Sequence, residues 1–225
     1  MSISSHRYKG IVFDMDGVLF DTERLHVDAW VFAGKETGYD ITEALMIKTI
    51  GISSNESIEI FHKYLGEDFD FFEVRKHRVK YTEEHVKKKG LPVKPGLEEL
   101  LQYLCDREYK LAVASSSDTE RIKENLNATG ILNYFNYVIG GDMITHGKPA
   151  PDIYQAACEN LNLLPSDCLA IEDSPAGMRS AHKAGLQVIM IPDLVVPDES
   201  IADIPYTMLQ SLGEVVRFLE ESTEE

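Results

Sequence analysis

The chain has 225 residues, about one and a half times the usual domain length, so it allows one large domain or a core with a smaller attachment. Apolar residues make up 44% and charged residues 27%, an ordinary globular composition that excludes a disordered or collagen-like chain. Its 38 acidic and 22 basic residues give a net charge of −16, which repels phosphate backbones and anionic lipids. Nucleic acid and membranes are therefore not expected as partners.

Sequence features also suggest a compartment. No apolar run approaches the roughly 18 residues that span a bilayer, and the opening residues do not resemble a secretory signal. The cysteines form no C-x-x-C pair, which agrees with a reducing environment. We therefore expect a cytoplasmic protein in which all three cysteines pack in the core: Cys105, Cys158 and Cys168.

Short apolar runs closed by polar residues predict the buried strands of a covered sheet. A stripe of leucines at helical spacing over residues 96–107 predicts one of the helices between them. The alternation of strands and helices predicts a doubly wound, parallel-sheet α/β core with its site at the carboxyl ends of the strands. The expected strands are residues 9–13, 111–114, 137–139, 169–171 and 188–191.

Three later helices of the core have recognisable starts. Ser117 and Glu120 form a capping box that predicts a helix from this point. Pro151 opens a second helix, and Ser174 followed by Pro175 is typical of an N-cap and the first helical position.

Residues 21–92 break this alternation. Apolar residues recur there at helical spacing, as at Leu25, Ala29 and Phe32, and no convincing strand pattern is visible. The run LPVKPG, with two prolines and a glycine, predicts a return linker. We therefore expect an all-helical cap domain, residues 21–94, inserted into a core made of residues 1–20 and 95–225.

Two carboxylates follow the first predicted strand in the sequence DMDG. Asp14 and Asp16 are two residues apart, so an extended chain directs both side chains to the same side. Like charges so close are costly unless a cation or phosphoryl chemistry uses them. A chance D-x-D in an exposed loop is the simpler alternative. A calcium loop fits poorly, because it needs glycine at the sixth position and here Gly17 is the fourth.

Further polar groups follow later strands. Ser115 and Ser116 come after the run LAVA, where hydroxyls and backbone N–H groups can cradle a phosphate or merely cap a helix. Lys148 lies in HGKPAPD, where it offers a fixed ammonium unless it is an ordinary surface lysine. Glu172 and Asp173 end the run LAIED. Four carboxylates at two strand ends predict a hard divalent cation, Mg²⁺.

In this order, D-x-D-G, a hydroxyl, K-P-x-P-D and E-D-S-x-x-G resemble the haloacid dehalogenase superfamily over essentially the whole chain. The segments DMDGVLFDTE, GKPAPD and IEDSPAG, with His26, are similar to the branch of β-phosphoglucomutases and small sugar-phosphate phosphatases. The second Asp of D-x-D opposes dehalogenation, because the dehalogenating members lack it. A cysteine-dependent phosphatase is excluded because no cysteine begins a C-x₅-R motif.

The resemblance implies a role for each site residue. Asp14 would be the nucleophile and Asp16 the general acid and base. Ser115, the Ser116 amide and Lys148 would hold the transferring phosphoryl group. The Mg²⁺ would be ligated by Asp14, the Asp16 carbonyl, Asp173 and, directly or through water, Glu172.

Substrate choice is expected to lie in the inserted domain. Candidate residues there are His26 and the basic stretch that contains Lys76, although that stretch could equally be a solvated helix face. Ser54 occupies the position where mutase members carry an arginine, and Asp118 replaces a lysine of theirs. The sequence therefore favours a hydrolase of a small phosphate ester. We expect a monomer or a weak homodimer. A mutase is the alternative, and a phosphorylatable binding module is a more remote one.

Overall fold

The computed structural model describes residues 8–50, 54–194 and 201–222. The chain divides into two compact units: Asp21–Pro92, and the segments Met1–Phe20 with Val93–Glu225. The expected insertion, residues 21–94, included residues 93 and 94. Val93 instead forms a β-bridge with Phe20, and the Lys94 N–H donates to the Leu19 carbonyl at 3.0 Å, so both residues belong to the first unit.

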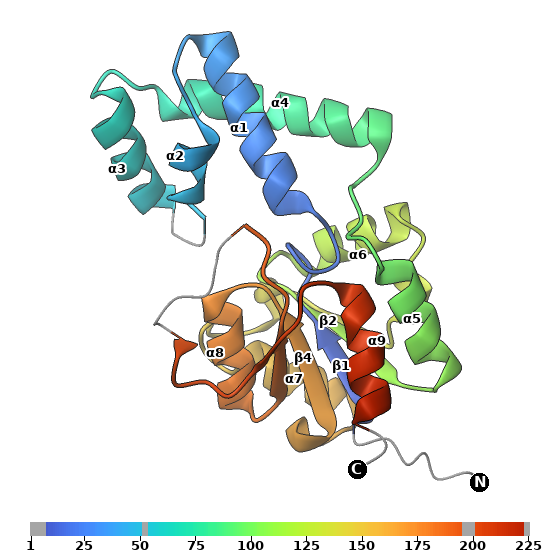
Figure 1. Cartoon of the computed structure of the whole chain (residues 1–225). Coiled ribbons are helices and arrows are strands. Elements are labelled where there is room, and N and C mark those ends of the chain that lie inside the picture. The colour runs from blue at the N-terminus through green and yellow to red at the C-terminus, as the bar shows by residue number, and fades with distance from the viewer. Residues whose placement is uncertain (1–7, 51–53, 195–200, 223–225) are drawn as a thin grey trace, which may run out of the picture. The chain divides into compact units, whose positions relative to one another are not determined.

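The first unit contains a six-stranded parallel sheet in the order β3-β2-β1-β4-β5-β6. Its strands β1, β2 and β4 are labelled in Figure 1. The chain moves outward from β1 in both directions, which places β2 and β4 on either side of it. This confirms the doubly wound α/β core, and the reversal of strand order at β1 creates a crevice at the carboxyl ends of the strands. The strands are β1 Gly10–Phe13, β2 Lys110–Ala114, β3 Tyr137–Ile139, β4 Cys168–Glu172, β5 Gln187–Met190 and β6 Thr207–Met208.

Helices bury both faces of this sheet. On one face, α7 and α8 pack against each other and over Val12, Ala112 and Ala170 from the three central strands. The residues that alternate with these, such as Ile11 and Leu111, are also buried, as expected for a sheet covered on both sides. The helices are α5 Leu97–Asp106, α6 Thr119–Ala128, α7 Asp152–Leu161, α8 Pro175–Ala184 and α9 Leu212–Glu221, with short 3₁₀ turns at Leu132–Tyr134, Gly141–Met143 and Pro165–Asp167.

The helix starts agree with the sequence in one case and differ in another. Ser174 is the N-cap of α8, its Oγ accepting the Gly177 N–H at 3.1 Å. The predicted capping box at Ser117 is wrong, because α6 begins at Thr119 and its N-cap residue is Asp118. Its first N–H, from Thr119, donates to Asp142 Oδ1 at 2.7 Å, so a carboxylate from beyond β3 caps this helix.

Two of the three cysteines are buried as expected, Cys158 and Cys168. Cys105 is exposed, because it lies on the solvent side of α5, beside the buried stripe of leucines.

The second unit is helical throughout its described residues, 21–50 and 54–92. It comprises α1 Thr22–Thr37, α2 Glu43–Ile47, α3 Ser54–Leu65 and α4 Phe71–Lys89. Its core is aromatic: the ring of Trp30 lies 4.9 Å from Phe61 and 5.3 Å from Phe71, so three helices contribute to one cluster. None of the helices within the described ranges of either unit has the length and hydropathy to cross a membrane.

Candidate active site

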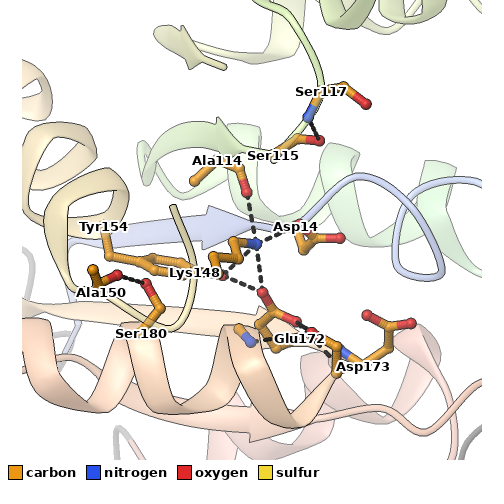
Figure 2. Close-up of polar contacts among 12 residues, drawn as sticks. Asp14, Ala114, Ser115, Ser117, Lys148, Ala150, Tyr154, Glu172, Asp173 and Ser180 are labelled. Carbon is orange, nitrogen blue, oxygen red and sulfur yellow. Dashed lines mark hydrogen bonds and ion pairs between the residues drawn. The ribbon is translucent and has the colours of Figure 1, made fainter. Parts of the chain in front are cut away.

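The site residues gather where β2, β1 and β4 end. Phe13 of β1 pairs with Val113 on one side and with Ile171 on the other, so the residues that follow these three, Asp14, Ala114 and Glu172, lie in one row, and Ser115 comes directly after Ala114. The Asp14 N–H donates to the Ile171 carbonyl at 3.0 Å, which extends the β1–β4 ladder to the nucleophile candidate. Parallel strands thus bring Asp14, Ser115 and Glu172 together from three distant parts of the sequence (Figure 2).

Lys148 joins this row from the loop before α7. Its ammonium lies 2.5 Å from Asp14 Oδ1, 2.6 Å from Glu172 Oε1 and 3.1 Å from the Ala114 carbonyl oxygen (Figure 2). An ammonium has three protons, so these acceptors use all of them. The Lys148 side chain is only 7% exposed. It is therefore a fixed, buried cation and not a solvated surface lysine.

Glu172 holds Lys148 through a carboxylate that is itself fully occupied. The residue is 0% exposed. Its Oε2 accepts from the Asp173 N–H at 3.1 Å, the Ser174 N–H at 3.2 Å and the Ser174 hydroxyl at 3.1 Å. Its Oε1 accepts from Lys148 and from the Tyr154 hydroxyl at 2.7 Å. Hydrogen bonds in such number fix the orientation of the carboxylate.

Sequence reasoning missed Tyr154. It lies on the buried stripe of α7 with Ala157 and Leu161, which indicates packing. The available signal was its hydroxyl, because a buried tyrosine needs a hydrogen-bond partner and Lys148 is six residues away.

Burial and neighbouring charges set the ionisation of the site. Burial raises the pKa of Asp14 to about 7; Lys148 opposes this increase, while Glu172 and Asp16 add to it. Burial also disfavours the charge on Lys148, but Asp14 and Glu172 outweigh it and raise the pKa of the ammonium. Lys148 is thus charged at neutral pH, whereas Asp14 needs further positive charge nearby to be a full carboxylate.

The arrangement of carboxylates fits a cation. Asp14, Glu172 and Asp173 each offer an oxygen, and these atoms lie within 4.8 Å of one another. Three carboxylates and one ammonium leave two negative charges, which a divalent ion would balance. Oxygen ligands of this kind suit Mg²⁺ or Ca²⁺. The residues present therefore fit a hard divalent cation.

Two glycines make room for these carboxylates. Gly17 has φ +81°, and a Cβ there would collide with the carboxylate of Asp173. At Gly177, the first turn of α8 comes so close to Glu172 that a Cβ would overlap its carboxylate. Glycine in D-x-D-G and in E-D-S-x-x-G thus has a steric reason.

Ser115 and Asp16 complete the predicted core site. Ser115 is 2% exposed at the end of β2, and its Oγ accepts the Ser117 N–H at 3.2 Å, which leaves the hydroxyl proton for donation. Ser116 is exposed on the same turn. The half-buried Asp16 lies close enough to Asp14 to raise its pKa, while Met15 between them is buried, as the alternation of the chain predicts.

In the helical unit, the structure separates the candidate residues. His26 is half-buried, and its Nε2 accepts the Trp30 indole N–H at 3.1 Å. Burial and the nearby Arg78 lower the pKa of His26 to about 4, so its imidazole is neutral. Arg78 lies over the Trp30 ring, with 6.0 Å between guanidinium carbon and ring centroid. The basic residue beside His26 is therefore Arg78.

The other two candidates of this unit are not placed with His26. The Lys76 side chain is 73% exposed and pairs with Glu73 at 2.6 Å, so it belongs to a solvated helix face. Ser54 is the first residue of α3, and its side chain lies outside the described residues.

Comparisons with known proteins identify the family of this chain. Residues 11–191 match the model of the haloacid dehalogenase-like hydrolase family. A phosphorylated carbohydrates phosphatase of Thermotoga maritima is 34% identical over 181 residues, which cover 80% of this chain and 83% of the relative. A β-phosphoglucomutase of Bacillus subtilis is 29% identical, with coverage of 94% and 98%.

Among solved structures, a hydrolase of this family from Deinococcus radiodurans superposes with a TM-score of 0.82 at 22% identity, covering 96% of this chain and 97% of that one. At that identity the likeness supports the fold, while the family match and the sequence relatives support the assignment. The chain therefore belongs to the haloacid dehalogenase-like hydrolase family and is an enzyme whose named relatives include phosphatases and a phosphoglucomutase.

Proposed function

We propose that this chain is a Mg²⁺-dependent phosphohydrolase that cleaves a small phosphorylated metabolite, a sugar or polyol phosphate, through an aspartyl-phosphate at Asp14. The observation that carries this proposal is the Lys148 ammonium fixed 2.5 Å from Asp14 beside the carboxylates of Glu172 and Asp173. The Thermotoga relative, a phosphorylated carbohydrates phosphatase, supports the class of substrate.

Two displacements would complete the reaction. An Asp14 oxygen attacks phosphorus in line while the P–O bond of the ester breaks, and the leaving oxygen takes a proton from Asp16. Asp16 then removes a proton from water, whose oxygen attacks the aspartyl-phosphate and releases inorganic phosphate with Asp14 regenerated. Phosphoryl transfer needs mainly alignment and positive charge around the equatorial oxygens. Lys148 supplies a fixed charge there, and the Ser115 hydroxyl supplies a donor.

Asp14, Asp173, Glu172 and the Asp16 carbonyl would hold Mg²⁺. When bound, the ion supplies charge neutralisation for the nucleophile and the phosphoryl oxygens. Glu172 already accepts five hydrogen bonds, so Asp14 and Asp173 are the principal carboxylate ligands in this proposal.

The surroundings of α6 favour hydrolysis over a mutase reaction. A mutase must hold a second, non-reacting phosphate near the turn after the core hydroxyl. In this chain the first N–H of α6 is bonded to the carboxylate of Asp142, and Asp118 is the N-cap residue. Two anionic side chains at a helix N-terminus occupy the position that favours a phosphate and repel one that approaches. Mutase activity is the second candidate, because the Bacillus β-phosphoglucomutase is similar over 94% of this chain.

A panel of sugar and polyol phosphates tests the proposal. Purified protein with Mg²⁺ should release inorganic phosphate, and relative kcat/KM values should identify the preferred ester. Asp14→Asn should abolish turnover. The matched control is Asp167→Asn, since Asp167 forms a surface ion pair with Lys9 just before β4. Full activity in Asp14→Asn would reject the nucleophile.

A separate incubation tests the mutase alternative. With β-glucose 1-phosphate and a catalytic amount of sugar bisphosphate, we expect inorganic phosphate to accumulate faster than glucose 6-phosphate. The opposite order would establish the mutase reaction as the main activity.

A further inference from the structure

Tyr154 lies against the charged pair of the site without facing the reacting carboxylate. It is 0% exposed on α7, and its hydroxyl lies 2.7 Å from Glu172 Oε1, the same oxygen that Lys148 contacts (Figure 2). The hydroxyl is 3.5 Å from the Lys148 ammonium, which is long for a hydrogen bond. The Tyr154 hydroxyl therefore interacts chiefly with Glu172.

The direction of that bond follows from the donors present. Lys148 already directs three protons at Asp14, Glu172 and the Ala114 carbonyl. The Tyr154 proton consequently points to Glu172 Oε1. The other oxygen of the Glu172 carboxylate, Oε2, is fixed by the Asp173 N–H, the Ser174 N–H and the Ser174 hydroxyl. Tyr154 fixes the other end, so the Glu172 carboxylate is held at both oxygens.

We propose that Tyr154 is a positioning residue, whose hydroxyl orients Glu172 so that the Lys148 ammonium lies between Glu172 and Asp14. The inference rests on the proposed function for its catalytic consequence. Without the hydroxyl, Lys148 is the only remaining donor to Glu172 Oε1 among the residues that the structure describes. The carboxylate can then turn toward the ammonium and draw it away from Asp14 and from the phosphoryl group that Asp14 attacks.

Tyr154→Phe isolates this effect. The substitution keeps the ring and its packing, including the contact in which the Lys148 ammonium lies 5.1 Å from the ring centroid, and removes only the hydroxyl. Because the hydroxyl acts on the group that neutralises charge during the reaction, we expect kcat to fall about tenfold, about 1.4 kcal/mol in the barrier, with KM for the ester changed less than about twofold.

The matched control is Tyr8→Phe. Tyr8 is also buried, and its hydroxyl donates to the Gln187 side-chain oxygen at 2.8 Å, at the start of β5 and away from the carboxyl ends of the strands. A general effect of losing one buried tyrosine hydroxyl would lower kcat equally in both variants, and that outcome would overturn the inference. So would a kcat for Tyr154→Phe equal to that of the wild type.

A second readout needs neither substrate nor metal. In ¹H–¹⁵N spectra of the lysine ammonium groups, recorded with a chelator present, the slowly exchanging signal that disappears in Lys148→Arg belongs to Lys148. We expect this signal to shift or broaden in Tyr154→Phe and to be unchanged in Tyr8→Phe. An unchanged signal in Tyr154→Phe would overturn the inference. Absence of turnover by the wild type on every ester would instead overturn the proposed function, while this spectrum would still decide the role of Tyr154.

Discussion

Replacement of Lys148 by methionine removes the only ammonium that contacts Asp14 and Glu172 among the described residues. Removal of one partner of a buried ion pair generally costs about 3–5 kcal/mol, because a charge is left buried without compensation. Here both carboxylates lose their cation. Asp14 can take up a proton, since its pKa is already raised to about 7, and Glu172 keeps its four other donors. We therefore expect a loss near the lower end, about 3 kcal/mol of unfolding free energy at pH 8.

Urea unfolding at pH 8 and pH 5, with a chelator present, measures this loss. A carboxyl whose folded pKa lies above its unfolded value contributes stability that is present at low pH and lost as pH rises through the folded pKa. Asp14 is such a group, so the deficit of Lys148→Met should be smaller at pH 5 than at pH 8. Lys110→Met is the control, because Lys110 is exposed and its ammonium donates to an uncharged acceptor, the Leu161 carbonyl, at 2.7 Å. Equal losses in the two variants, or a deficit that does not shrink at pH 5, would refute the reasoning.

Three further predictions concern other residues. Gly177→Ala should lower the free energy of unfolding in urea by about 1–3 kcal/mol and kcat by at least about tenfold, because the added Cβ would overlap the Glu172 carboxylate and reverse the usual benefit of alanine in a helix. The control Gly213→Ala in α9, where the Cβ has only ordinary contacts, should be neutral or stabilising, and the same cost in both variants would contradict this. The contribution of His26 to stability should fall by at most about 3 kcal/mol as pH drops from about 6.5 toward about 4, because its pKa is lowered in the folded state and the unfolded chain binds the proton first. The difference in melting temperature between the wild type and His26→Gln should therefore shift against the wild type from pH 7.5 to pH 5, and a constant difference would contradict this. Lys76→Ala should leave kcat/KM within about twofold and stability within about 0.5 kcal/mol, as for exposed surface residues, and a tenfold loss of kcat/KM would place Lys76 at the substrate.

The core and its site could be predicted because both depend on local patterns. A strand buried on both faces is a continuous apolar run, and the residue after such a run lies at the carboxyl edge of a parallel sheet. Asp14, Ser115 and Glu172 could therefore be placed on one edge from the sequence alone. Strand β6 was missed because two residues, Thr207 and Met208, are too short to show a pattern.

Contacts that depend on tertiary packing could not be predicted in this way. The cap of α6 comes from Asp142, which is 23 residues from Thr119, so a local search found Ser117 instead. Tyr154 carries the periodicity of a core residue, and only the packing of α7 over β4 shows that its hydroxyl meets Glu172.

The basic stretch of α4 contained a usable signal. Val74 is buried, and Arg78 follows it by four residues, which places both on the same face of the helix. Lys76 follows Val74 by two residues and so lies on another face, where it pairs with Glu73. The helical period therefore favours Arg78 as the inward basic residue, although charge alone does not distinguish it from its neighbours.

The distribution of compensated charge is the strongest physical reason to place the reaction at this edge of the sheet. Glu172 has five donors, and the ammonium of Lys148 has three acceptors, so these two buried charges are satisfied within the fold. Within the described part of the chain, Lys148 is the one cation paired with Asp14, and the half-buried Asp173 adds another carboxylate within 4.8 Å. Buried charge without compensation is costly and is retained where function requires it. The negative charge is thus least compensated at the nucleophile candidate, where a bound divalent ion would add positive charge beside the incoming phosphoryl group.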